Sequence, residues 1–93
     1  MKLQSFTNVW DALTDSPADS ANMTLRSDLL IVLQQTVTGW GLTQAETVRR
    51  LGITQPRLTD LLGGKVAEFS LDALVNLATE AGLSVELRTS RAA

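Results

Sequence analysis

The chain has 93 residues, 44% hydrophobic and 19% charged, and a formal net charge of −2; a chain this short holds one core, so residues 1–93 are expected to form a single domain. Cysteine and histidine are both absent, which excludes disulfides and the two commonest zinc ligands, and neither a cofactor nor catalysis is expected. The acidic balance argues against a nucleic-acid partner unless basic residues are concentrated in one part of the chain.

Residues 1–23 are expected to be an N-terminal arm that contains one short helix. Asn8 can cap this helix, and Val9, Ala12 and Leu13 follow at helical spacing. So short a helix is unstable without something to pack against. The start of the chain lacks the pattern of a secretory signal, so a cytoplasmic location is expected.

A long core helix is predicted over residues 24–38. One apolar stripe indicates it, and Gly39 ends it. Two starts remain open, one at Ser16-Pro17 and one at Thr24. The longest apolar run, residues 29–33, is too short to cross a bilayer, so no membrane partner is expected. The predicted stripe consists of Leu29, Val32, Leu33, Thr36 and Val37.

Residues 43–64 have the pattern of a helix-turn-helix. Thr43 and Glu46 form a capping box that begins the first helix, and Gly52 can take the left-handed conformation that ends it. Thr54 can cap the second helix, which Gly63-Gly64 ends. The predicted buried faces are Ala45, Val48 and Leu51 in the first helix and Leu58, Leu61 and Leu62 in the second.

The outward face of the second helix carries side chains suited to base edges. Arginine can pair with guanine, glutamine with adenine, a threonine methyl with thymine, and aspartate with the cytosine amino group. Proline is tolerated here because it lies in the first turn. We therefore predict that this face contacts DNA bases through Gln55, Pro56, Arg57, Thr59 and Asp60.

Two further residues are expected to contact the DNA backbone. Gln44 lies in the first turn of the first helix, where free amides and the helix dipole favour a phosphate. Lys65 follows the second helix. Residues 43–65 are also the only net positive third of the chain, with four basic and two acidic residues. A solvated helix face remains the competing interpretation of this pattern.

The C-terminal part is expected to form one more helix and a strand. The helix begins after Ser70 and stops at Gly82. Alternating apolar residues then predict a strand over 83–88, with Leu83, Val85 and Leu87 on one face. The strand needs a partner, either residues 2–6 or the same strand of a second chain. The second option is favoured, because a homodimer also suits a near-palindromic double-stranded DNA operator.

The segment GLTQAETVRRLGITQPRLTDLLGGK, residues 41–65, closely resembles the helix-turn-helix of the Xre/Cro family of bacterial and phage repressors. The resemblance implies a mostly α, five-helix, lambda-repressor-like DNA-binding domain. It places base-reading positions on Gln55, Pro56 and Asp60, beside Arg57 and Thr59, and phosphate contacts on Gln44 and Lys65. Pro56 and Asp60 depart from the family's usual longer amides, which leaves the base preference open.

The flanking segments resemble HigA-like antitoxins of bacterial toxin-antitoxin pairs. The likeness rests on FTNVWDAL at 6–13, LRSDLL at 25–30 and FSLDALVNLATEAGLSVEL at 69–87. It implies an antitoxin that neutralises a small protein toxin and represses its own operon. The expected toxin contacts are Phe6, Val9, Trp10 and Leu13, although Trp10 can instead cover the long helix. The alternatives are a stand-alone Xre-type regulator and a protein-interaction module without DNA binding.

Overall fold

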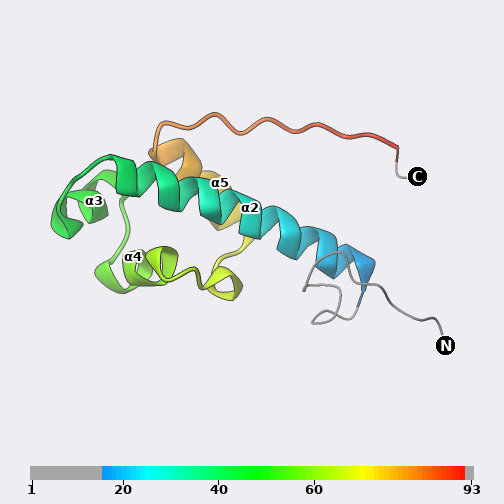
Figure 1. Ribbon diagram of the computed structural model, residues 1–93, viewed down its shortest axis with the longest axis horizontal. Helices are drawn as coiled ribbons and strands as arrows, with labels where there is room; N and C mark the ends of the chain where they lie inside the picture. Colours follow the sequence, from blue (N-terminus) through cyan, green and yellow to red (C-terminus); the bar gives the residue numbers. More distant parts are fainter. Residues whose placement is uncertain (1–15, 92–93) are drawn as a thin grey trace.

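The computed structural model describes residues 16–91, which contain four α-helices and one short 3-10 turn. Figure 1 shows the long α2 along the longest axis, with the shorter helices gathered along its C-terminal part and residues 83–91 running back beside it. The mostly helical fold class is confirmed for this part of the chain. The short helix predicted within 1–23 lies outside the described residues. The elements are α2 (Pro17–Gly39), α3 (Gln44–Leu51), α4 (Gln55–Leu62), η1 (Val66–Glu68) and α5 (Leu71–Glu80).

Helix α2 begins at the earlier of its two candidate starts. The Ser16 hydroxyl accepts a hydrogen bond of 3.1 Å from the backbone N–H of Asp19, and Pro17 occupies the first turn. A proline there loses no helical hydrogen bond and already has a helical φ. Residues 17–23 therefore belong to the long helix and not to an N-terminal arm.

The buried stripe of α2 differs from the predicted one. Leu33 and Val37 are buried as expected, but Leu30 completes the stripe, and Val32 is 43% exposed. The helix carries two neighbouring apolar stripes, and the other helices pack on only one of them. Leu29, which was predicted to be buried, is half-buried beside the core, and Thr36 is half-buried as well.

Within residues 16–91, every helix contributes to one hydrophobic core. Its largest fully buried side chains are Phe69, Leu33, Leu51, Leu58, Leu61 and Leu74. In α3 the predicted Ala45 is exposed and Thr47 is buried instead, with its hydroxyl donating to the Thr43 carbonyl at 2.9 Å. That bond satisfies the threonine's polar atom inside the core. Leu62, also predicted to be buried, is 41% exposed.

Helix α5 begins as predicted, after Ser70, whose hydroxyl accepts from the backbone N–H of Ala73 at 3.1 Å. The predicted strand over 83–88 is not formed within residues 16–91. A strand is defined by ladder hydrogen bonds to a neighbour, and the candidate neighbour in the same chain, residues 2–6, lies outside the described range. None of the described helices combines the length and apolarity needed to cross a membrane.

Candidate nucleic-acid interface

The turn between α3 and α4 is fixed by one glycine and two backbone hydrogen bonds. Gly52 has a φ of +69°, in the left-handed region that side chains disfavour. The N–H groups of Gly52 and Ile53 donate to the Val48 carbonyl at 2.9 and 3.2 Å. The Thr54 hydroxyl then caps α4 by accepting from the Arg57 N–H at 3.4 Å. These local contacts redirect the chain sharply, as a helix-turn-helix requires.

The capping box at the start of α3 is complete. The Glu46 N–H donates to the Thr43 hydroxyl at 3.2 Å, and the Thr43 N–H donates to the Glu46 carboxylate at 3.0 Å. The bond from the Thr43 backbone, followed by that from its hydroxyl and by the charge of Arg49, lowers the pKa of Glu46. The carboxylate is therefore charged at neutral pH, and it faces the positive end of the helix dipole.

Two glutamines from different helices meet at one exposed edge. Gln55 Nε2 donates to Gln44 Oε1 at 2.9 Å, and both side chains are exposed. The bond restrains the amide plane of Gln55 while leaving its Oε1 and one N–H unused. The two groups left on Gln55 form the acceptor-donor pair that adenine requires in the major groove. The Gln44 amide group remains able to donate to a phosphate.

The remaining predicted residues of α4 occupy different sides of the helix. Successive residues turn by about 100°, so burial of Leu58 and Leu61 directs Pro56 outward. Gln55 and Arg57 fall on opposite flanks. Thr59 is exposed, and its hydroxyl donates to the Gln55 carbonyl at 3.1 Å. The outward ridge of α4 consists of Pro56, Thr59 and Asp60, with Gln55 at one side.

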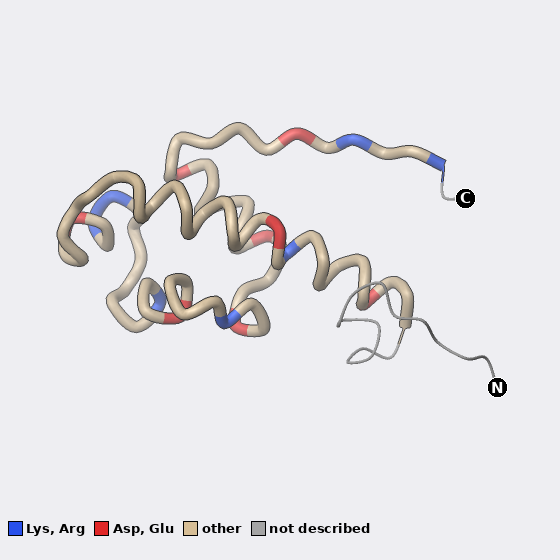
Figure 2. The backbone as a smooth tube through the Cα atoms, in the orientation of Figure 1, with Lys and Arg blue, Asp and Glu red and all other residues tan. Residues whose placement is uncertain are grey.

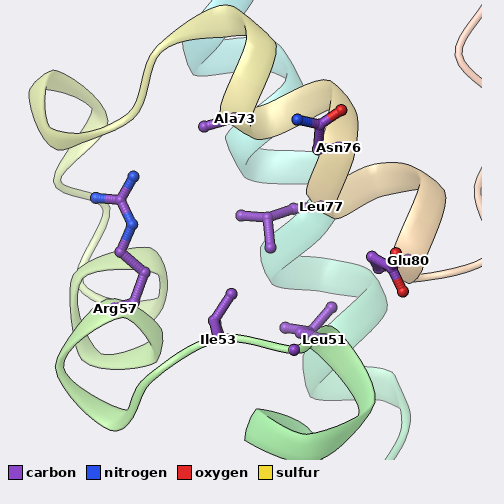
Figure 3. A pocket seen from close by; sticks show the side chains of 8 residues that line it. Leu51, Ile53, Arg57, Ala73, Asn76, Leu77 and Glu80 are labelled. Atoms are coloured by element: carbon purple, nitrogen blue, oxygen red, sulfur yellow. The ribbon is translucent and has the colours of Figure 1, made fainter.

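Arg57 contacts the segment that leads into α5. Its Nη1 donates to the Glu68 carbonyl at 2.6 Å, and its guanidinium carbon lies 4.1 Å from the centre of the Phe69 ring. Figure 3 shows Arg57 at one side of a pocket between α4 and α5 that Ile53 and Leu77 also line. The structure therefore separates Arg57 from Gln55, and guanine recognition by Arg57, which remains a prediction, would require these contacts to break.

Asp60 and Lys65 face each other at the end of α4. Lys65 Nζ lies 3.7 Å from Asp60 Oδ1, and the Lys65 side chain is 64% exposed. The cation offsets part of the repulsion that a carboxylate would exert on phosphates. Figure 2 shows basic and acidic positions interspersed along α4 and the loop after it, with further basic residues at the end of α3.

Two side chains of α2 hold α4 and the segment before α5 in place, and the sequence did not predict either contact. Gln34 Nε2, from α2, donates to the carbonyls of Leu61 and Leu62 at 2.9 and 3.3 Å. Arg26 Nη1 donates to the Phe69 carbonyl at 3.1 Å. Both bonds join segments far apart in the chain, so no local pattern could identify them. Trp40, at the C-terminal end of α2, packs against the core, with the guanidinium carbon of Arg50 3.8 Å from its ring centre.

Comparison with known proteins agrees with this geometry. A family model described as a helix-turn-helix domain matches residues 12–90. No curated protein matches the chain. The family match covers all four helices of the described region and most of the full sequence. The chain therefore belongs to the helix-turn-helix domain family.

Proposed function

We propose that this protein is a sequence-specific DNA-binding transcriptional repressor that acts without catalysis. The supporting observation is the exposed Gln44–Gln55 pair, with a bond of 2.9 Å, in front of the buried Leu58 and Leu61. The leucines hold α4 to the core, and the pair holds one amide plane outward. A rigid element that presents oriented polar groups is what major-groove recognition needs.

In the proposed complex, α4 enters the major groove and α3 lies across the DNA backbone. Gln55 contacts an adenine through its Oε1 and its remaining N–H. Gln44 and the first-turn amides of α3 donate to a phosphate. Lys65, which is exposed after α4, neutralises a second phosphate and releases its counterions. Pro56, Thr59 and Asp60 set the preference at neighbouring base pairs.

The repressor is proposed to bind as a homodimer to a near-palindromic operator. A single α4 of eight residues contacts few base pairs, and a second copy doubles the number of specific contacts. The two half-sites are then expected about 34 Å apart, one turn of DNA.

The test is a fluorescence-anisotropy titration of the full chain with the DNA upstream of its own gene and with a scrambled duplex, at several salt concentrations. Log affinity is expected to fall linearly with log salt, because bound phosphates release counterions. Gln55→Ala should lose the preference for the native sequence and keep the salt slope. If the affinity for both duplexes does not depend on salt, the proposed DNA binding is wrong, and the helix-turn-helix serves only as a structural scaffold.

We further propose that the protein is the antitoxin of a bacterial toxin-antitoxin pair and acts in the cytoplasm. The resemblance of the flanking segments to HigA-like proteins supports this role. The expected toxin contacts, Phe6, Val9, Trp10 and Leu13, lie outside the described residues. The proposed toxin is a small basic protein encoded by an adjacent gene. Expression of that protein alone should arrest growth, and co-expression of this chain should relieve the arrest. Continued arrest, without co-purification of the two proteins, would favour a stand-alone regulator.

A further inference from the structure

The C-terminal segment leaves its backbone polar groups without partners in the described chain. The Leu83 N–H donates to the Ala78 carbonyl at 2.9 Å, and beyond this bond residues 84–91 make no backbone hydrogen bond to another described residue. The segment follows an extended course beside α2 (Figure 1). An extended segment with free N–H and C=O groups is a template for pairing with another strand.

An apolar groove of about 400 Å³ lies between this segment, α2 and α5. Its α2 side is the second apolar stripe of that helix, including Leu25, which is 53% exposed, and Val32, which is 43% exposed. The C-terminal segment contributes Val85, 47% exposed, and Leu87, 87% exposed. Leaving this much contiguous apolar surface in water costs free energy, so such a surface indicates an interface. The apolar lining residues are Leu25, Leu29, Val32, Leu71, Val75, Val85 and Leu87.

We infer that a second copy of this chain covers the groove, by pairing residues 83–91 of the two copies as an antiparallel ribbon centred on Leu87. The inference rests on the proposed repressor's two-fold dimer and specifies its contact surface. In the ribbon, the Val85 and Leu87 side chains of both copies share the face that lies over the grooves. The backbone groups of each segment gain ladder partners, and the second stripe of α2 is removed from water.

The charges of the segment favour this occupant and this register. With Leu87 on the two-fold axis, Glu86 of one copy lies opposite Arg88 of the other, and the pair occurs twice. Moving the axis to position 86 would place Glu86 opposite its own copy, and like charges directly opposed are destabilising. Moving it to position 85 would place Glu86 opposite Ser84 and leave both charges unpaired across the ribbon. The sequence is therefore complementary to itself about Leu87.

Single cysteines test the register in the full chain, because the native sequence contains none. Leu87→Cys, Glu86→Cys and Val85→Cys change side chains in the extended segment outside the core. Under mild oxidation, Leu87→Cys should form the covalent dimer fastest, because a residue on the axis meets its own copy. Faster cross-linking by either of the other variants would overturn the Leu87 register. Failure of all three, with a native chain that is monomeric by light scattering, would overturn the second copy as occupant.

Two substitutions on α2 test the groove itself. Val32→Glu places a charge on the groove wall, whereas the matched Ile31→Glu places one at a 50% exposed apolar side chain that does not line the groove. By sedimentation equilibrium, Val32→Glu should raise the dimer dissociation constant at least about tenfold, because the charge would have to be buried. Ile31→Glu should leave it unchanged. Equal effects from the two variants would contradict the inference.

Two additional measurements keep the outcomes separate. Far-UV circular dichroism checks that Val32→Glu folds. Leu87→Glu repeats the measurement of dimer dissociation with a charge at an almost fully exposed position outside the helices. Both assembly assays are done without DNA. A dimer that does not bind DNA would refute the proposed repressor function and leave this interface standing. A monomer that binds half of an operator would refute this interface and leave the DNA-binding function standing.

Discussion

Arg57 lies with its guanidinium carbon 4.1 Å from the centre of the Phe69 ring and donates to the adjacent Glu68 carbonyl at 2.6 Å. These contacts tie one flank of α4 to the segment that enters α5. Gln55 lies on the other flank, held by Gln44. The proposed recognition helix is therefore fastened on both sides, by an arginine at the core side and by a glutamine at the exposed edge.

Replacing Arg57 by alanine should lower the free energy of unfolding by about 1–2 kcal/mol, because a charge-assisted hydrogen bond and a cation–π contact are lost. Urea denaturation measures the change. Arg57→Lys should lie between wild type and Arg57→Ala, because lysine keeps the charge without the planar group. Unchanged stability together with a loss of about 1–3 kcal/mol on native-sequence DNA alone would instead identify Arg57 as a guanine contact.

Gln34→Ala should destabilise the protein by about 1 kcal/mol, because the carbonyls at the end of α4 lose their donor. Gln35→Ala is the matched control, since Gln35 is the exposed neighbour on the same helix. Thermal or urea unfolding of both variants compares them. If the two variants unfold alike, the bonds from Gln34 to Leu61 and Leu62 contribute nothing measurable.

The capping box should make stability depend on pH through Glu46. Its pKa is lowered below the ordinary value of 4.5, chiefly by the hydrogen bond from the Thr43 backbone. A carboxylate with a lowered folded-state pKa stabilises the fold above its unfolded-state pKa, and this stabilisation is lost as pH falls through the folded-state value. The difference in unfolding midpoint between wild type and Glu46→Gln should therefore be constant near neutral pH and shrink below about pH 4.

The Glu46→Gln variant isolates the effect of the charge on Glu46. Glutamine can still accept from the Thr43 N–H but carries no charge, so the two proteins differ mainly in the titrating group. Thr43→Ala should cost about 1 kcal/mol, the typical value for a lost N-cap. A wild-type minus Glu46→Gln difference that persists unchanged to pH 3 would show that the Glu46 charge does not act through this cap.

The Asp60–Lys65 pair should tune affinity for DNA of any sequence. Lys65→Ala is expected to weaken binding to native and scrambled duplexes alike and to reduce the salt slope by about 1, because one phosphate contact is lost. Asp60→Asn should strengthen binding to the scrambled duplex, because a carboxylate that repels phosphates is removed. Anisotropy titrations on the two duplexes measure both effects. A loss of affinity confined to the native sequence would show that Lys65 contacts a base edge and not the phosphate backbone.

The local features of the fold were predictable because their causes lie within a few residues. Thr43 and Glu46 are three residues apart, so their sequence alone predicted the capping box that the structure contains. Gly52 was predicted to end α3 because few other residues adopt a positive φ. The exposed position of Gln55 followed from the spacing of Leu58 and Leu61, which locate the buried face of α4. The helix-turn-helix thus required no knowledge of tertiary contacts.

Long-range packing decided what remained. Helix α2 carries two apolar stripes, and only the positions of α4, η1 and α5 determine that Leu30 is buried and Val32 is exposed. Gln34 and Arg57 acquire their partners in the same way, from groups that the fold brings near. Thr47 bonds locally to Thr43, and only its burial depends on the fold. The sequence alone determined where α3, α4 and α5 begin and where the chain turns between them, because those hydrogen bonds are local, but it left two starts open for α2. Tertiary structure decided which faces meet, because burial depends on residues distant in the chain.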